Sequence, residues 1–291
     1  MNLASFVIIT PARNEGQYLQ RTIDSVLAQT LRPQKWILVN DGSTDDTGAL
    51  IDAAAEQHSW IQAVHRSDRG FRQAGSGVVE AFYDGYSRLG ATPWDYLVKL
   101  DGDLALAPDY FEQCFKHFHA DPQLGLGGGL VCIEQHGKVE EDSKGDPRFH
   151  VRGATKIYRR ACWQEIGGLF RETGWDTLDE VKANMLGWKT RTFRELRLRQ
   201  LKGTGAADGA WRNSVKNGLA NYIAGYHPLF MLGKCLKRAF ARPYLVEAAG
   251  LWLGFMSGYL RGSRQVDDPA LVQYLRGQQC RKMTLRPSIW D

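Results

Sequence analysis

Two acidic residues stand two positions apart, Asp101 and Asp103, directly after a short apolar run at residues 96–100. Two carboxylates at this spacing, just past a strand, can share one divalent cation. Oxygen ligands suit Mg²⁺ or Mn²⁺, and such a cation keeps water ligands and binds substrate phosphates. The pair therefore predicts a metal site for a phosphorylated ligand, although two ordinary loop aspartates would give the same pattern.

Polar residues also follow two earlier apolar runs, as Pro11-Ala12-Arg13-Asn14-Glu15 and as Asn40-Asp41-Gly42-Ser43. In an open α/β sheet, ligands bind at the carboxyl ends of the strands. These clusters suit a nucleotide base and ribose, with the metal holding the diphosphate. The first strand lacks a following GxGxxG, which argues against a nicotinamide dinucleotide, and the absence of GxxxxGK[ST] excludes a P-loop.

The elements that must position these residues alternate along the first 130 positions. Period-2 and short apolar runs predict strands at 6–10, 36–39, 61–65 and 96–100, and the 3.6-residue period predicts helices at 17–29, 47–57, 76–89 and 108–118. Such alternation indicates parallel βαβ units in an open α/β sheet. A glycine-rich strand follows at 124–133 and a mobile surface loop at 134–148. Beyond about residue 209 only helices are expected, at 209–222, 229–240, 243–260 and 269–282.

Composition limits the class of protein. The chain has 291 residues, 43% of them hydrophobic, which is enough for a sizeable core. Its five cysteines form no CxxC pair, which argues against a disulfide framework and fits a reducing compartment. Charge is divided unevenly: residues 1–180 carry 18 Lys and Arg against 26 Asp and Glu, whereas residues 181–291 carry 19 against 6. The basic part could meet nucleic acid, phosphorylated substrates or an anionic membrane, or be a solvated face.

Four segments in a fixed order resemble the motifs of the family-2 glycosyltransferases: FVIITPARNE, WILVNDGSTDDT, YLVKLDGDL and GWDTLDEVKANMLGWKT. The resemblance covers about residues 5–195. It implies the GT-A fold, an open and mostly parallel sheet flanked by helices, and an inverting transfer from a nucleotide sugar. We expect a transferase domain at 1–208 and a basic, partly apolar helical extension at 209–291.

The resemblance also implies a role for individual residues. Asp176 would be the general base that takes the proton of the acceptor hydroxyl, with Asp179 and Glu180 as competitors for that role. Asp101 and Asp103 would bind Mn²⁺ or Mg²⁺. The expected nucleotide contacts are Pro11, Ala12, Arg13, Glu15, Asp41, Ser43, Arg72 and Asp101.

On the acceptor side we expect Trp175 and Asp179, although Trp175 is equally compatible with a place in the core. Lys99, near the end of a strand, is expected to cover a sheet edge. The chain departs from the family at two points: many relatives have Glu at the position of Trp175, and many have a His as third metal ligand where residues 196–208 contain none. Asp208 or a water would then take its place.

In the helical extension, Lys234, Lys237, Arg238 and Arg242 interrupt an apolar stretch. This pattern is typical of a helix on a membrane surface, and a bundle that only covers the α/β domain is the alternative. The uncharged run at 248–260 is shorter than the roughly 20 residues of a membrane-spanning helix. A nucleic-acid partner is not favoured, because the basic residues mix with apolar runs and no recognition motif occurs.

The sequence thus predicts a metal-dependent inverting glycosyltransferase. It would move a sugar from a nucleoside diphosphate to a hydroxyl of a lipid-linked or glycan acceptor in cell-surface polysaccharide synthesis. We expect it in the cytoplasm, peripheral on the inner membrane face. Two alternatives are a polyprenyl-phosphate glycosyltransferase, which the segment LDGDLALAP resembles, and a non-catalytic nucleotide- or glycan-binding protein of the same fold.

Overall fold

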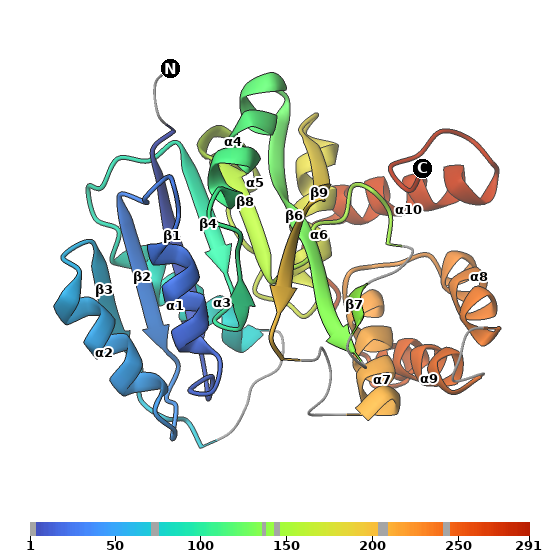
Figure 1. Ribbon diagram of the computed structural model, residues 1–291. Coiled ribbons are helices and arrows are strands. Elements are labelled where there is room, and N and C mark those ends of the chain that lie inside the picture. The colour runs from blue at the N-terminus through green and yellow to red at the C-terminus, as the bar shows by residue number, and fades with distance from the viewer. Residues whose placement is uncertain (1–3, 71–75, 136–137, 143–145, 203–208, 241–244) are drawn as a thin grey trace.

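A mixed β-sheet with helices on both faces forms the body of the protein, and a group of helices packs to one side of it (Figure 1). The computed structural model describes residues 4–70, 76–135, 138–142, 146–202, 209–240 and 245–291. In this part of the chain the strands form one sheet in the order β3-β2-β1-β4-β8-β6-β9-β5, and β7 pairs with β6.

The N-terminal half of the sheet is parallel, as the alternating pattern predicts. β1 pairs with β2 and β4, and β2 pairs with β3, all in parallel register. The elements are β1 (Phe6–Ala12), α1 (Leu19–Leu27), β2 (Lys35–Asn40), α2 (Thr47–Gln57), β3 (Ile61–His65), α3 (Ser76–Ser87) and β4 (Tyr96–Leu100). Parallel strands end at the same edge, so the segments after β1, β2 and β4 share one end of the sheet.

The C-terminal half of the sheet is mixed. β8 runs antiparallel to β4 and β6, whereas β6 and β9 are parallel to each other. Its elements are β5 (Leu104–Ala105), α4 (Tyr110–Ala120), β6 (Leu124–Gln135), β7 (Lys138–Glu141), β8 (Thr155–Arg159), α5 (Arg160–Ile166), α6 (Trp175–Met185) and β9 (Lys189–Gln200). The α/β fold is confirmed, with antiparallel pairs added to its parallel half.

One local prediction is wrong: the stretch at 134–148 was expected to be a loop, but it contains β7. This strand pairs antiparallel with the end of β6, with Glu141 opposite Cys132. The sequence Lys138–Glu141 is charged, and its apolar content is a single valine, so it lacks the alternation that marks a half-buried strand. Pairing with the long strand β6, rather than its own composition, makes it a strand.

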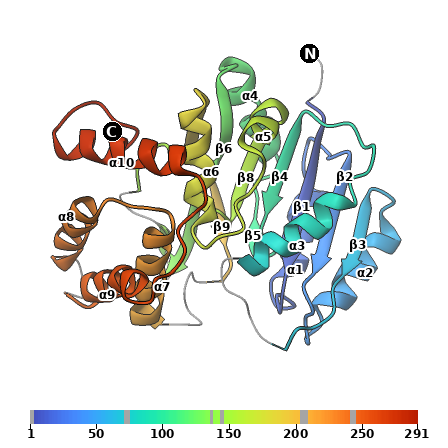
Figure 2. The same ribbon diagram turned by 180° about the vertical axis from the view of Figure 1, so that it is seen from behind.

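Two cores lie on the two faces of the sheet. Phe6 and Ile8 of β1 point into one core, beneath α1, α2 and α4, and Val7 and Ile9 point into the other, beneath α3, α5 and α6. Figure 2 shows α3 and α5 on the face opposite α1 and α2. Because both faces are covered, all seven residues of β1 are buried, which explains its continuous apolar run.

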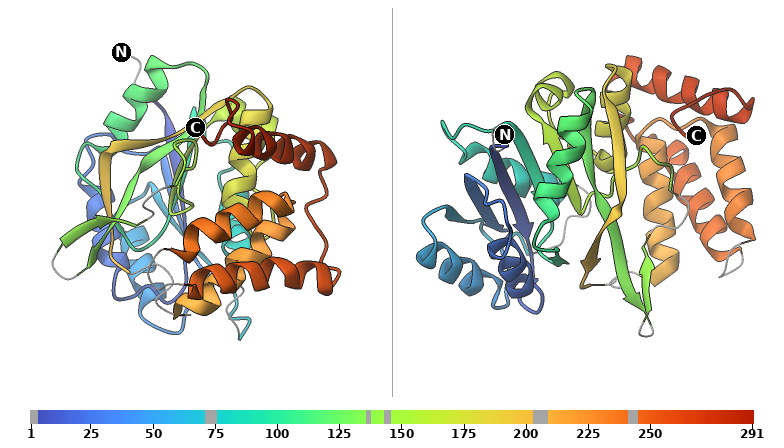
Figure 3. Two further views of the ribbon diagram at one scale, coloured as in Figure 1. Left: turned by 90° about the vertical axis from the view of Figure 1, so that its right-hand side faces the viewer. Right: turned by 45° about the horizontal axis from the view of Figure 1, so that its top comes forward.

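The helical extension contains α7 (Gly209–Ile223), α8 (Pro228–Ala239), α9 (Val246–Leu260) and α10 (Pro269–Met283), close to the predicted ranges. Figure 3 shows these helices gathered beyond α6. A third core joins them to the transferase body, since Leu178 and Val181 of α6 pack with residues of all four helices or their ends. An ion pair of 2.5 Å between Lys182 and Asp268 adds to this contact. Residues 203–208, where the expected domain boundary falls, lie outside the described ranges.

Glycines allow α7 and α9 to pack in close contact. A Cβ atom added to Gly254 would lie 2.0 Å from the carbonyl oxygen of Val215, and one added to Gly218 would lie 2.1 Å from that of Leu251. Only glycine fits at such a backbone approach. Across the described ranges, none of the helices reaches the combination of length and apolar character that crossing a bilayer requires.

Candidate functional site

Three strand-end segments meet at one edge of the sheet. The backbone N–H of Asp41 donates to the carbonyl of Ala12 over 2.8 Å. A Cβ atom on Gly102 would lie 3.5 Å from the Cβ of Ala12 and 3.8 Å from the Cγ of Glu15. The structure therefore brings together the segments after β1, β2 and β4, as the parallel register requires.

The carboxylates of Asp101 and Asp103 interact electrostatically but differ in burial. Asp103 is 6% exposed, whereas the side chain of Asp101 is 30% exposed. Burial, together with the negative charges of Asp101 and Glu15, raises the pKa of Asp103 to about 7, although a hydrogen bond of 3.0 Å from Gln200 opposes the shift. Crowded acidic oxygens of this kind are the ligands that Mg²⁺ or Mn²⁺ prefers.

The donor set fits a cation that keeps other ligands. Within the described ranges, no group of three or more His, Cys, Asp or Glu residues is arranged to enclose a metal. Mg²⁺ is usually bound by one or two carboxylates together with water and substrate phosphates, so a closed cage is not needed here. The side-chain amide of Gln200, on β9, donates to Asp103 and holds this carboxylate from the neighbouring strand. Asp208, the suggested substitute, lies outside the described residues.

Lys99 does not cover a sheet edge, contrary to the prediction. It lies in β4, inside the sheet, and is 2% exposed. Its Nζ donates to a carboxylate oxygen of Asp101 and to the carbonyl oxygen of Gly153. Residues i and i+2 of a strand point to the same face, so Lys99 is correctly oriented to hold Asp101 just beyond the strand end. This spacing was available in the sequence as an indication of the contact.

Asp41 lies at the centre of an arginine cluster. Its carboxylate, 9% exposed, pairs with both Arg66 and Arg69, and Arg13 donates to its backbone carbonyl. Arg13 also pairs with Asp68 at 2.8 Å. Ion pairs of this kind offset the cost of burying a carboxylate away from water. The sequence pointed to Asp41 and Arg13, but Arg66 follows β3 in the chain and was missed.

Ser43 and Asn14 connect the loops after β2 and β1. The N–H of Asn14 donates to the Ser43 hydroxyl over 3.0 Å, and the N–H of Thr44 donates to the Asn14 side chain over 2.9 Å. Asn14 has a φ of 53°, in the left-handed region that asparagine tolerates better than most residues. These bonds order the predicted nucleotide pocket. Pro11 lies within β1, and Arg72 falls outside the described residues.

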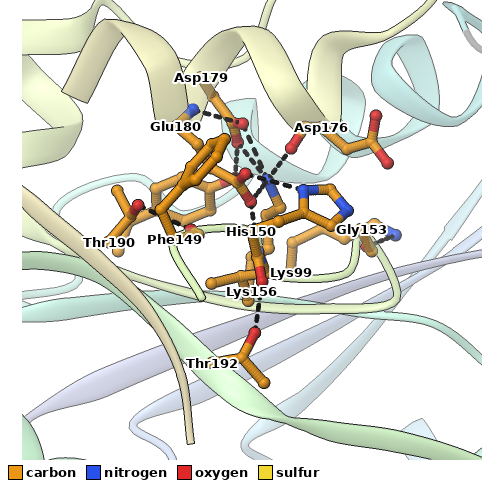
Figure 4. A network of polar contacts seen from close by, with 12 residues as sticks. Lys99, Phe149, His150, Gly153, Lys156, Asp176, Asp179, Glu180, Thr190 and Thr192 are labelled. Carbon is orange, nitrogen blue, oxygen red and sulfur yellow. Dashed lines mark hydrogen bonds and ion pairs between the residues drawn. The ribbon is translucent and has the colours of Figure 1, made fainter. Parts of the chain in front are cut away.

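Asp176 occupies the first turn of α6 and is half-buried. Its backbone carbonyl accepts a hydrogen bond of 2.5 Å from Lys156, while its carboxylate points away from that lysine (Figure 4). Among the described residues, no ion pair engages this carboxylate. A side chain fixed through its backbone and free at its carboxylate is suited to accept a proton.

Asp179 cannot contact an acceptor in this structure, which corrects the prediction. It has no exposed surface, and its carboxylate is bound by Lys156 at 2.8 and 3.0 Å and by the Tyr158 hydroxyl. Glu180 is equally buried and pairs with Lys156 at 2.8 Å and with His150 at 2.9 Å. Both acids are therefore engaged in buried ionic contacts, whereas Asp176 is the acid of α6 whose side chain is only partly buried.

Trp175 belongs to the core rather than to an open wall. It is 6% exposed and packs with the core beneath α3, α5 and α6. Its ring centroid lies 5.4 Å from the Nζ atoms of both Lys99 and Lys156, which face each other in the register of β4 and β8. Two like charges at opposite positions destabilise a sheet. The ring between them, and the acids beside each, offset that repulsion.

Lys99 also connects the two acidic centres of the site. It bonds Asp101 on one side and the Gly153 carbonyl on the other. A Cβ atom on Gly153 would lie 3.2 Å from the Cβ of Asp176, so Gly153 lies directly against the candidate base. The candidate metal site and the candidate base are thus linked through Lys99 and Gly153. Figure 4 labels Lys99, Gly153 and Asp176 of this path.

A match to a family model shows the family of the chain. The model described as Glycosyl transferase family 2 matches residues 7–172. The chain belongs to this family. As a family-2 glycosyltransferase it is an enzyme, and the non-catalytic alternative no longer applies.

Curated relatives match parts of the chain. It is 33% identical over 117 residues to a chondroitin synthase of Pasteurella multocida, covering 40% of this chain and 11% of that protein. It is 28% identical over 159 residues to the glycosyltransferase GlyG of Streptococcus pneumoniae, covering 55% and 48%, and 31% identical over 141 residues to a poly-beta-1,6-N-acetyl-D-glucosamine synthase of Staphylococcus aureus, covering 47% and 31%. The chain therefore spans at most about half the length of these relatives.

Solved structures share the fold. The mannosyltransferase PcManGT of Pyrobaculum calidifontis, in complex with GDP-Man and Mn²⁺, superposes with a TM-score of 0.57 at 17% identity, covering 96% of this chain and 81% of that one. Residues 1–349 of TarS from S. aureus, in complex with UDP, give a TM-score of 0.54 at 13% identity, covering 89% and 72%. The fold of this family-2 enzyme is thus the GT-A fold that the sequence predicts.

Proposed function

We propose that this enzyme transfers a sugar from a nucleoside diphosphate to an acceptor hydroxyl, with inversion and with a divalent cation. The observation that carries the proposal is the pairing of two centres at one end of the sheet. One is the acidic pair Asp101 and Asp103, and the other is the carboxylate of Asp176, which forms no ion pair with the residues that the structure describes. Lys99 and Gly153 lie between them.

The donor would lie over the ends of β1, β2 and β4. Pro11, Ala12 and Glu15 would line the nucleoside pocket, Asp41 and Ser43 would contact the base, and Asp101 the ribose or the cation. Arg13 and Arg72 are further nucleotide contacts in this proposal. The neighbours named as complexes with GDP-Man and Mn²⁺ and with UDP support this kind of donor.

Asp101 and Asp103 would hold Mn²⁺ or Mg²⁺, which neutralises charge that grows on the diphosphate as it leaves. Lys99 keeps Asp101 in position and supplies a buried positive charge next to it. Gln200 orients Asp103 from β9. These contacts prepare an acidic pair of defined geometry before the donor binds.

Asp176 would act as the general base. The acceptor oxygen attacks the anomeric carbon, its proton passes to the Asp176 carboxylate, and the bond between that carbon and the phosphate oxygen breaks. The diphosphate leaves on the opposite face, which inverts the configuration. A hydroxyl needs such a base whereas an acceptor phosphate is already ionised, so the free carboxylate favours a hydroxyl acceptor over a polyprenyl phosphate.

We further propose a glycan or lipid-linked acceptor and a peripheral position on the cytoplasmic membrane face. Relatives named as synthases of chondroitin and poly-N-acetylglucosamine support a role in making surface polysaccharide. The basic, partly apolar extension supports contact with an anionic membrane.

The test is a donor screen in solution. UDP-, GDP- and dTDP-sugars are incubated with the enzyme and with Mn²⁺, Mg²⁺ or EDTA, and release of the nucleoside diphosphate and the anomeric configuration of the product are followed by NMR. One donor class should react in the presence of the cation, give the inverted product, and fail in EDTA. Full turnover in EDTA, or a product of retained configuration, would refute the mechanism.

A further inference from the structure

The helix α8 exposes a row of large apolar side chains to solvent. Its exposed fractions are 62% for Leu229, 42% for Leu232, 57% for Leu236 and 84% for Phe240. Spacings of three and four residues place these side chains along one face of the helix. We call them the α8 stripe. A different face packs inward, since Met231 is fully buried and Cys235 nearly so.

Exposed apolar residues are concentrated in this part of the molecule. Elsewhere in the extension, large apolar side chains are exposed at Trp211, Leu245, Val246, Leu253, Tyr259, Leu260, Met283 and Leu285. In the rest of the described chain, such exposure is limited to Leu27, Val139 and Leu186. Isolated exposed leucines need no explanation, but a cluster of this kind marks an interaction surface.

The charge of the same region identifies the partner. Residues 209–291 carry 12 Lys and Arg against four Asp and Glu, and Lys237 is exposed next to the α8 stripe. Two such basic faces would repel each other, so a second copy of the chain is disfavoured. An anionic lipid surface offers both an apolar layer and the opposite charge.

The length of α8 limits how this helix can contact a membrane. α8 has 12 residues and is about 18 Å long at 1.5 Å per residue, much less than a bilayer core of about 30 Å. Apolar residues on one face with basic residues beside them are typical of a helix that lies in the plane of the interface. We propose that the α8 stripe docks this enzyme on the surface of an anionic bilayer.

The other side of α8 packs into the core that the extension shares with α6. Tyr226, just before the helix, is buried in this core together with Leu178 of α6. Lys234 packs over the Tyr226 ring at 5.3 Å instead of facing outward with the stripe.

Vesicle flotation tests the proposal without requiring activity. The full chain should float with vesicles of phosphatidylcholine and phosphatidylglycerol and remain at the bottom with phosphatidylcholine alone. The triple variant Leu232→Ser/Leu236→Ser/Phe240→Ser should lose at least tenfold in the floated fraction. The matched control Leu27→Ser/Leu186→Ser changes exposed leucines of the transferase body and should float like the unsubstituted protein. Lys237→Glu should give an intermediate loss.

Three results would overturn the proposal: no flotation of the unsubstituted protein, equal flotation of the triple variant, or equal loss in the control. Light scattering tests the alternative that the α8 stripe contacts a second copy of the chain. A dimer of the unsubstituted protein that becomes a monomer in the triple variant would support that alternative and contradict the proposal. Circular dichroism melts establish that each variant folds. Nucleotide release in solution is measured in parallel, so intact flotation without turnover would refute the proposed function and leave the docking face standing.

Discussion

The first and second turns of α6 carry acids of the same chemical type with opposite environments. Asp176 in the first turn keeps a half-buried carboxylate that points away from the lysine beneath it. Asp179 and Glu180, one turn on, have no exposed surface and share Lys156. The difference teaches that position on the helix, not residue type, separates a group that can exchange protons from one that holds the fold together.

Lys156 is the centre of the buried turn. Burial alone would lower its pKa, but the charges of Asp179, Glu180 and Asp176 outweigh that effect and raise it, so the lysine is charged. The ammonium holds α6 against β8 through side chains of α6 and the backbone carbonyl of Asp176. A buried group with this many ionic partners fixes the helix that presents the candidate base.

The largest effect is expected for Lys156→Met, which would leave two buried carboxylates without their cation. We expect a loss of about 3–5 kcal/mol in the free energy of unfolding, since breaking a buried ion pair strands the remaining charge. Urea denaturation measures it. The control is Lys189→Met, which removes an exposed ion pair to Asp121 and should cost less than about 1 kcal/mol. Similar losses in both variants would remove the distinction between buried and exposed pairs.

The next-largest effect is expected for Asp176, in the first turn of α6. Asp176→Asn should lower kcat at least about a hundredfold, equivalent to about 2.7 kcal/mol, because the amide cannot accept the acceptor proton. The free energy of unfolding should change by less than about 0.5 kcal/mol, since no ion pair of the described chain is lost. Steady-state kinetics and urea denaturation measure the two quantities. Unchanged turnover would remove Asp176 from the chemistry.

Lys99→Met tests a third lysine contact, between the acidic pair and the acceptor side of the site. Lys99 donates to both Asp101 and the Gly153 carbonyl. We expect kcat to fall by about tenfold, equivalent to about 1.4 kcal/mol in the activation free energy. We also expect the variant to need a higher Mn²⁺ concentration to reach half of its maximal rate. Titration of the rate with Mn²⁺ measures this. Lys99→Arg should restore part of the loss by keeping the charge. If Lys99→Met only destabilised the protein, the cation requirement would stay the same.

The smallest effect is a pH dependence of stability at His150. Burial lowers its pKa, but the charge and hydrogen bond of Glu180 outweigh it, so the pKa of the folded state lies above 6.5. A raised pKa of this kind gives stability that is complete below pH 6.5 and is lost as the pH rises through the folded-state value. His150→Gln should therefore lower the free energy of unfolding more at pH 6 than at pH 9 in urea denaturation. An equal cost at both values would contradict the ionised pair.

The sequence predicted the parallel half of the fold almost residue for residue. The ranges Thr47–Gln57, Ile61–His65 and Tyr96–Leu100 coincide with the predicted elements, because each has a clear period and a turn or cap at its ends. β7 was missed, because its four residues become a strand only by pairing with β6. Periodicity describes a segment's own burial and does not show which long-range partner it meets.

The candidate site was predicted unevenly for the same reason. Asp101, Asp103 and Asp176 belong to contiguous motifs, so their types and order were informative. Lys99 was misinterpreted and Lys156 unmentioned because their partners depend on the register of β4 with β8, which places them opposite each other across 56 intervening residues. Asp179 was predicted to compete for the base position and to contact the acceptor, whereas tertiary packing turns it inward.

The close approach of α7 and α9 has an evolutionary consequence. A methyl group at Gly218 or Gly254 would overlap the backbone of the opposite helix, so no rearrangement of side chains alone could accommodate it. The two helices, separated in the chain by α8, must therefore be inherited together. Recombination between residues 223 and 246 would break this pair wherever the incoming helix carries a residue larger than glycine at the close contact. This extension should consequently pass between lineages as one undivided module, whatever variation its outer surface accumulates.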